Sequence, residues 1–333
     1  WWFDHLQRSV FIGDPGVRYF VARRNEECIA VLPIRLGRRG HVRVVEPLAN
    51  YYTSLYEPPL HASATPDELA ALLSQASHLH GNAHEMRFAP MDPDSEAYRL
   101  LISALRKNGW APFRYFCFGN WHLEVDSDWP EYLRNRPGPV RSTIKRMSKK
   151  FAAAGGTLEI IHSAKDIDAA AAAYVEIYSA SWKVPEPYPE FMPGLIRHLA
   201  ASGRLRLGIA RLQGQPIAAQ VWAVQSGRAA IIKLAHREDS TEHSPGTLLT
   251  ALLIEHVISI DRVREVDYLI GDDPYKQNWM SQRRERWGIV AYNPRTLMGL
   301  VLLVRELAAR VAKALVQSSR RLFASVRAAS PTP

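Results

Sequence analysis

The most constraining feature of the sequence is a run of three closely spaced strand patterns in its second half. The patterns cover Arg204–Arg211, Pro216–Gln225 and Arg228–His236. Short turns that contain glycine, at Gln213-Gly214 and Ser226-Gly227, separate them. Turns of this kind join antiparallel strands because glycine accepts the backbone conformation that a tight hairpin needs. The segment therefore predicts an antiparallel meander.

A helix, a fourth strand and a polar loop follow the meander. The turn Ser244–Thr247 offers a serine as helix cap and a proline at the first helical position, so a helix is expected over Thr247–Ile260. The amides at a helix N-terminus attract anions. A strand is expected over Glu265–Ile270, and the polar loop Gly271–Lys276 comes directly after it. This order of elements predicts a ligand site within His236–Trp279.

The remainder of the chain adds further strands and helices, so the fold class is expected to be α+β. Strand patterns at Val17–Arg23 and Cys28–Leu36 open the first half, and Trp110–Val125 is rich in aromatic residues and predicts strand pairs. The stretch Asp126–Pro139 holds three prolines and reads as a boundary. Three parts follow from this pattern: an N-terminal lobe, 1–128; a C-terminal lobe, 129–294; and a basic amphipathic helix and tail, 295–333.

The charge is concentrated in two segments. Of a net charge of +9, Arg134–Lys150 carries seven basic residues and no acid, and Pro294–Pro333 carries seven basic residues and one acid. Such segments favour anionic partners or form solvated helix faces. No apolar run is long enough to span a membrane, and no His/Cys cluster predicts a metal. The two cysteines, Cys28 and Cys117, are expected to be buried and reduced, as in a cytoplasmic protein.

Several short motifs, in order, resemble the core of GCN5-related N-acetyltransferases (GNAT). They are Gly214-Gln-Pro-Ile-Ala218, Ser244-Pro-Gly246, Asp267-Tyr-Leu-Ile-Gly-Asp272, Tyr275-Lys276 and Trp279. The sequence is most similar to the CelD/BcsL-like acetyltransferases, relatives of the FemAB aminoacyltransferases. This resemblance implies two tandem GNAT-like lobes with mixed, mostly antiparallel sheets flanked by helices. It also implies an N- or O-acyltransferase that uses acyl-CoA, with acetyl-CoA the first candidate, and no metal.

The resemblance leaves the donor and the acceptor open. Many relatives place an Arg/Gln-x-x-Gly-x-Gly/Ala loop on the donor's pyrophosphate, whereas this chain has Glu242–Thr247 in that place. The donor is therefore acetyl-CoA, a longer acyl-CoA, an acyl carrier protein, or an aminoacyl-tRNA as in the FemAB relatives. The family context suggests an amine or hydroxyl of an envelope or exopolysaccharide precursor as acceptor.

Candidate site residues follow from this resemblance and from their places at strand ends. Asp272, His236 and Asp267 are candidates for the base, each with an ordinary structural role as the alternative. Lys276 is expected to neutralise an oxyanion or a phosphate, or else to cover Trp279 with its stem. The donor is assigned to Ser244, Gly246, Thr247 and Lys233, and the acceptor to the aromatic residues Trp182, Tyr178, Tyr275 and Trp279, which are otherwise core residues.

Two other functions stay open on the sequence alone. Transfer from tRNA would use the basic helix Arg141–Lys150, although no aromatic RNA-binding motif accompanies it. A non-catalytic scaffold would be held at a membrane by the C-terminal helix, Met298–Val326, whose basic residues are Arg305, Arg310, Lys313, Arg320 and Arg321. That helix is expected to pack on the body of the protein or to contact anionic lipid at the inner face of the membrane.

Overall fold

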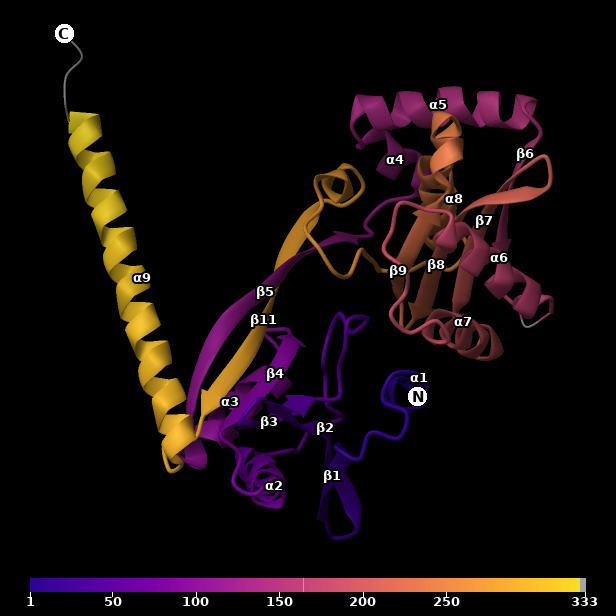
Figure 1. Cartoon of the computed structure of the whole chain (residues 1–333). Helices are drawn as coiled ribbons and strands as arrows, with labels where there is room; N and C mark the ends of the chain where they lie inside the picture. Colours follow the sequence, from indigo (N-terminus) through magenta and orange to yellow (C-terminus); the bar gives the residue numbers. More distant parts are fainter. Residues whose placement is uncertain (164, 330–333) are drawn as a thin grey trace. The chain divides into compact units, whose positions relative to one another are not determined.

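The computed structural model describes residues 1–163 and 165–329, with side chains of the last helix described as far as Val316. The chain forms two compact units (Figure 1). The first unit comprises Trp1–Gly13 and Phe118–Arg286, and the second comprises Asp14–Cys117 and Trp287–Pro333. The unit boundaries fall inside two long strands, β5 and β11, so each of these strands contributes residues to both units. The domain bounds expected from the sequence differ from these units and stay a prediction.

The first unit is built on the predicted meander. Strands β6, β7, β8 and β9 pair in sequence order, each antiparallel to the next. Strand β9 then pairs parallel to the short strand β10, which in turn pairs antiparallel to β5. The bounds are β5, Ala111–Glu124; β6, Gly156–Ile161; β7, Leu205–Leu212; β8, Gln215–Gln225; β9, Arg228–His236; and β10, Glu265–Asp267.

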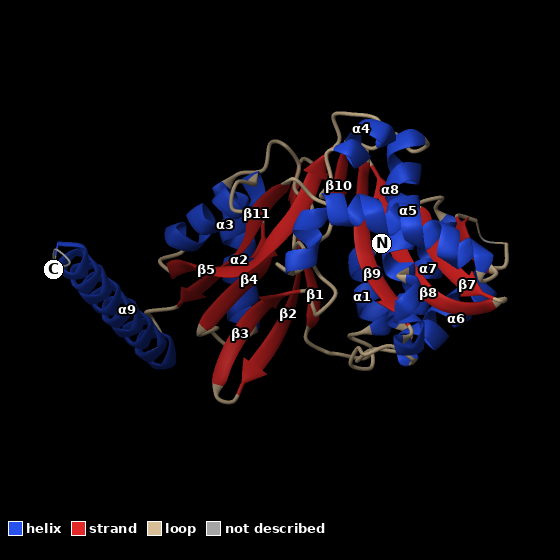
Figure 2. Ribbon diagram, turned by 90° about the horizontal axis from the view of Figure 1, so that it is seen from above, coloured by secondary structure: helices blue, strands red, loops and turns tan. Residues whose placement is uncertain are grey.

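Helices cover both faces of this sheet (Figures 1 and 2). A long buried run in β8, from Pro216 to Trp222, shows that neither face is open to solvent. A Cβ at Gly208 would lie 2.8 Å from the Leu253 side chain, so the glycine lets helix α8 approach β7 closely. The helices and 3-10 turns are α1, Trp2–Ser9; α4, Trp129–Arg134; α5, Gly138–Ala153; α6, Ile167–Ser179; α7, Phe191–Ala201; η1, Glu238–His243; α8, Pro245–Ser259; and η2, Pro274–Asn278.

In the second unit the strands follow one another in the order β1-β2-β3-β4-β11. Its pairs are antiparallel except for β3 with β4. The capping box that Thr65 and Glu68 form at the start of α2 anchors the first helix of this unit. The bounds are β1, Val17–Arg24; β2, Glu27–Arg39; β3, Val42–Pro47; β4, Glu85–Met91; β11, Gln282–Tyr292; α2, Pro66–Leu79; α3, Glu96–Lys107; and α9, Leu297–Ala329.

The structure corrects several expectations. Residues 111–124 form one long strand and not strand pairs. Strand β10 ends at Asp267, three residues early, because Leu269 has φ 53° and its amide donates to the Asp267 carboxylate at 2.7 Å. Cys28 is exposed, since it stands near the hairpin turn that joins β1 to β2, and Cys117 is half-buried. Within the described residues, no helix is long and apolar enough to cross a membrane. Arg320 and Arg321 lie outside the described side chains.

Candidate active site

The first unit contains a cavity of about 620 Å³ beside the carboxyl end of β9. Strands β9 and β10 pair over only three residues, from Arg228 to Ala230 on β9. Strand β9 continues to His236, whereas β10 stops at Asp267, so the two parallel strands separate beyond their paired ends. The cavity lining includes Leu234 and His236 from β9 and Tyr268 from the chain after β10. Because the two strands do not pair here, a ligand can reach backbone groups that would otherwise be hydrogen-bonded between the strands.

The start of helix α8 forms one wall of the cavity. Ser244, Pro245, Gly246, Thr247 and Thr250 all line it. The expectation that the Ser244 side chain caps the helix is wrong, because Ser244 is left-handed at φ 49° and makes no side-chain cap bond. The first-turn amides of a helix have no partner within the helix. Ser244, Gly246 and Thr247, which the sequence assigned to the donor, all lie on this wall, and their role in donor binding stays a prediction.

Gln220 fixes this helix start to the sheet, and sequence reasoning missed it. Its side-chain amide donates to the Gly246 carbonyl at 2.9 Å and to the Thr250 hydroxyl oxygen at 2.8 Å. The side-chain carbonyl of Gln220 accepts a hydrogen bond from the Trp222 indole N–H at 3.0 Å. The side chain is buried and its bonds are satisfied, so it holds the first turn of α8 in one position. A glutamine inside the otherwise apolar strand 216–223 was the available signal.

His236 and Trp182 meet in the cavity wall beside the start of α8, where a Cβ at Gly246 would lie 3.7 Å from the His236 ring. Their ring centroids are 4.4 Å apart, and both side chains line the cavity. The Nδ1 atom of His236 lies 3.1 Å from the Arg237 carbonyl oxygen. A carbonyl can only accept, so in the neutral ring Nδ1 carries the proton and Nε2 keeps a free lone pair. A second cavity, of about 360 Å³, is lined by Trp182, His236, Glu238 and Thr241, so the two cavities share this ring pair.

Lys183 is a further cavity residue that sequence reasoning missed. Its Nζ donates to the Leu234 carbonyl at 2.5 Å and lies 5.9 Å from the Tyr178 ring centroid. Burial, with the nearby charge of Lys233 second, lowers the pKa of Lys183 from 10.5 to about 8. A lysine directly after a tryptophan in a proline-rich loop gave no signal of this burial.

Lys276 is buried and holds the loop that follows β10. Its Nζ donates to the carbonyls of Ile270, at 2.5 Å, and Gly271, at 3.2 Å, and it lies 3.0 Å from the Asp273 carboxylate. Burial lowers the pKa of Lys276, while the bond to Asp273 opposes that shift. Lys276 does not line the cavity, whereas Asp273 and Tyr275 do. The lysine therefore positions two cavity residues.

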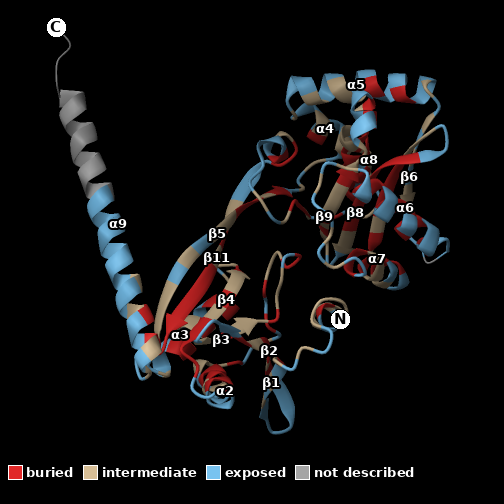
Figure 3. Cartoon of the chain, viewed as in Figure 1, coloured by how far each residue is buried: buried red, intermediate tan, exposed pale blue. Residues whose placement is uncertain are grey.

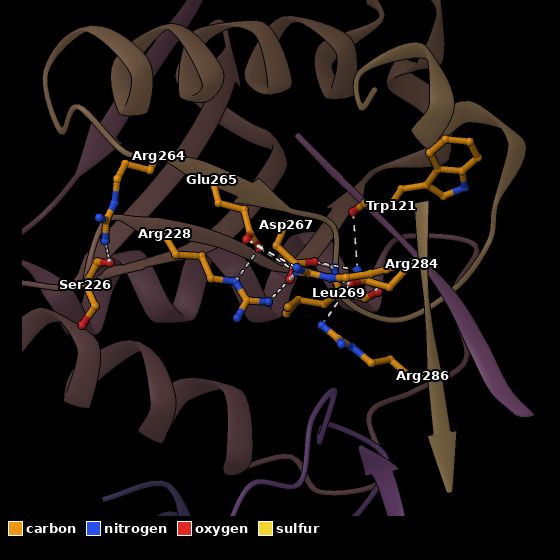
Figure 4. Close-up of polar contacts among 10 residues, drawn as sticks. Trp121, Ser226, Arg228, Arg264, Glu265, Asp267, Leu269, Arg284 and Arg286 are labelled. Carbon is orange, nitrogen blue, oxygen red and sulfur yellow. Dashed lines mark hydrogen bonds and ion pairs between the residues drawn. The ribbon is translucent and has the colours of Figure 1, made fainter. Parts of the chain in front are cut away.

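Asp267 lies beneath the site in a network of ion pairs (Figure 4). It is fully buried and pairs with Arg228 and, at 2.6 Å, with Arg284. Asn120 donates to the same carboxylate at 2.6 Å. Arginine and amide donors thus surround this carboxylate, and it does not line the cavity. Its position suits a structural role at the end of β10 better than proton transfer.

The other predicted residues divide between cavity wall and surroundings. Tyr275 and Trp279 line the cavity, but Tyr178, Lys233 and Asp272 do not. Asp272 is partly exposed, and the hydrogen bond from Arg283, at 2.6 Å, is the largest cause that lowers its pKa. Lys233 lies 3.2 Å from the Glu186 carboxylate. Asp272 therefore stabilises an arginine beside the site, and its role as a base stays a prediction with no support from this geometry.

Residues 139–277 match the family model Acetyltransferase (GNAT) domain. These residues therefore form a GNAT-type acyltransferase domain. The matched GNAT domain contains the meander β7–β9, helix α8, and every residue that lines the larger cavity except Asn278 and Trp279. The narrower CelD/BcsL branch is not distinguished by this match, and no curated protein is similar enough in sequence to match.

Solved structures share the fold at low sequence identity. A crystal structure of FemX has a TM-score of 0.55 at 10% identity, covering 83% of this chain and 87% of its own. The C-terminal domain of a protein described as a lysylphosphatidylglycerol synthetase, from Agrobacterium fabrum, has a TM-score of 0.53 at 12% identity, covering 90% and 89%. A conserved protein from Bacteroides thetaiotaomicron has a TM-score of 0.57 at 8% identity, covering 87% and 89%. Coverage this large means that the likeness extends over both units.

The described part of the chain holds no group of three His, Cys, Asp or Glu side chains placed to bind a metal ion. The polar groups around the cavity are hydroxyls, amides, a histidine, a lysine and the Asp273 carboxylate. Such groups suit the binding of phosphates and the transfer of protons.

Proposed function

We propose that the GNAT domain transfers an acyl group from acyl-CoA, acetyl-CoA first, to an amine or hydroxyl acceptor. The observation that carries this proposal is the cavity that joins the start of helix α8 to His236. The donor's phosphates would lie at the first-turn amides of Gly246 and Thr247, where the helix dipole favours negative charge. The acyl thioester would then lie toward His236.

The reaction is a direct transfer. The acceptor N–H or O–H attacks the thioester carbonyl, a C–N or C–O bond forms, the C–S bond breaks and CoA leaves as the thiolate. The acceptor's proton goes to Nε2 of His236, whose Nδ1–H is held by the Arg237 carbonyl. Burial raises the pKa of Tyr268 well above 10, so its phenol stays protonated. As a cavity residue, Tyr268 can donate a hydrogen bond to the thioester oxygen or to the thiolate.

The acceptor would approach through the smaller cavity. Trp182 is half exposed and stands beside His236 at the junction of the two cavities. An exposed tryptophan face next to a base favours a ring-shaped acceptor such as a sugar, because the face covers apolar ring carbons and leaves the hydroxyls or amines to the base. An envelope or exopolysaccharide precursor fits this chemistry.

The first test is donor binding. Acetyl-CoA is expected to raise the melting temperature of the full chain, since a ligand at about 100 times its Kd stabilises the folded state by roughly 2.7 kcal/mol. ATP, which lacks the pantetheine thioester, is the control and should shift the melting temperature less. No shift with acetyl-CoA or with longer acyl-CoAs would contradict a CoA donor.

Aminoacyl transfer from tRNA is the second candidate. Helix α5 exposes Arg141, Lys145 and Lys149. Val140 and Thr143 of the same helix line the larger cavity, so a basic surface adjoins the site. The affinity for tRNA should then fall steeply as the salt concentration rises. A variant with the three basic residues changed to Gln should bind tRNA more weakly and show a smaller dependence on salt. Equal binding by both chains would contradict this candidate.

The non-catalytic scaffold makes the opposite prediction for His236. A scaffold should lose no biological output when His236 becomes Gln, because that change leaves the outer surface of the unit nearly the same. An acyltransferase should lose output together with thioester turnover.

A further inference from the structure

Helix α9 presents two different faces. One face packs on the second unit: Leu302 is buried in a cluster with Val290 and Tyr292. Further along the same face, the Arg310 guanidinium lies 4.8 Å from the Phe113 ring centroid and donates to the Arg114 carbonyl at 3.0 Å. These contacts fix which side of the helix is turned to the protein.

The opposite side of α9 carries an exposed apolar stripe. Its residues recur every three or four positions, so on a helix they share one side. They range from 44% exposed at Leu300 to 82% exposed at Leu297. Figure 3 shows the described part of α9 exposed along most of its length. The stripe consists of Leu297, Leu300, Val301, Val304, Leu307, Val311 and Leu315.

Seven aliphatic side chains in one exposed row are not a normal soluble surface. A contiguous apolar patch of this size on a monomer marks an interaction site. The burial of Leu302 and the bonds of Arg310 hold the helix in the orientation that exposes the stripe, so the helix cannot turn it inward without losing those contacts.

Charge distinguishes the two partners that the stripe could meet. Pro294–Pro333 carries seven basic residues and one acid, Glu306. Glu306 is already bonded to Arg310 at 2.8 Å. A second copy of α9 would therefore bring positive charge against positive charge with no acid to compensate. An anionic lipid surface supplies negative charge along its whole plane and apolar chains below it.

We propose that α9 lies on an anionic lipid surface, with the stripe in the acyl-chain boundary and Arg305 at the level of the headgroups. Arg305 is exposed and stands one helical turn after Val301 at the edge of the stripe, where it can reach anionic headgroups. This inference concerns the second unit and does not depend on the donor of the acyltransferase.

Vesicle sedimentation with the full chain tests the proposal. The chain is expected to bind phosphatidylcholine vesicles that contain about one third phosphatidylglycerol, and to bind pure phosphatidylcholine vesicles at least about tenfold more weakly. The double variant Val304→Asp with Val311→Asp places two charges in the stripe and should weaken binding about tenfold or more.

The control variant makes the same charge change off the stripe. Ala309→Asp with Val316→Asp has the same seven-residue spacing, and both positions are exposed. It should retain clearly more binding than the stripe variant, and circular dichroism should show both variants folded. Equal loss in the two variants, or no binding to anionic vesicles by the unmodified chain, would overturn the proposal. So would a dimer in the absence of vesicles that the stripe variant converts to a monomer.

Discussion

Placing a negative charge at the start of helix α8 should prevent donor binding without unfolding the protein. Thr247 is the third residue of α8 and lines the larger cavity. In Thr247→Asp, a carboxylate would stand ~5 Å from a donor phosphate. At an effective dielectric constant of about 20, one such pair of charges repels by about 3 kcal/mol. Partial screening by water reduces this to about 2 kcal/mol, which is a roughly 30-fold increase in Kd.

The same substitution should stabilise the protein when no donor is bound. An acidic residue in the first turn interacts favourably with the helix dipole by about 0.3–1 kcal/mol. The melting temperature of the variant without ligand should therefore be unchanged or about 1–3 °C higher. A loss of donor binding together with a stable fold separates this effect from damage to the structure.

The assay is calorimetric titration with acetyl-CoA at low salt. Thr247→Asn is the matched control, because asparagine is nearly isosteric with aspartate and carries no charge. The Kd of acetyl-CoA for this variant should change by less than about threefold. Raising the salt concentration should reduce the difference between the Asp and Asn variants. If Thr247→Asp binds acetyl-CoA as tightly as Thr247→Asn does, the phosphates do not lie at the start of α8.

Four further outcomes follow from the geometry. His236→Gln should lower thioester turnover about 10²–10⁴-fold in stopped-time assays, with little change in the Kd of acetyl-CoA. Lys276→Met should weaken donor binding by loosening the loop that carries Asp273 and Tyr275, seen as faster amide hydrogen exchange there. Asp267→Ala should cost about 1–3 kcal/mol in chemical denaturation, because it removes the buried carboxylate that accepts from Asn120 and Arg284. Since burial lowers the pKa of Lys183 from 10.5 to about 8, its charge destabilises the fold below pH 8. The free energy of unfolding of Lys183→Met should exceed that of the unmodified chain most at pH 7. This difference should fall by about 3 kcal/mol as the pH rises to 10.5.

Local chemistry accounts for what the sequence predicted well. The meander and helix α8 depend on turns, periodicity and a proline at a helix start, which act over a few residues. Ser244, Gly246 and Thr247, which were assigned to the donor, are neighbours in the chain, so one local motif brings all three to the cavity wall. His236, a predicted base, lies at the cavity because it ends a clear strand pattern, and its role as the base stays a prediction.

Pairing between distant segments accounts for what was missed. Asp267 was a candidate base because it ends a strand, but Arg228 and Arg284, which neutralise it, come from other strands. Gln220 contributes through a contact with Gly246, 26 residues away in the chain. Sequence periodicity does not report which polar side chains meet across a sheet, so these roles needed the tertiary structure.

The most direct test of the central claim is a crystal structure of the chain with acetyl-CoA bound. The account predicts the pyrophosphate at the amides of Gly246 and Thr247 and the thioester beside His236, inside the larger cavity. Donor density elsewhere on the chain, or phosphates on the exposed face of α5 with the cavity empty, would contradict it.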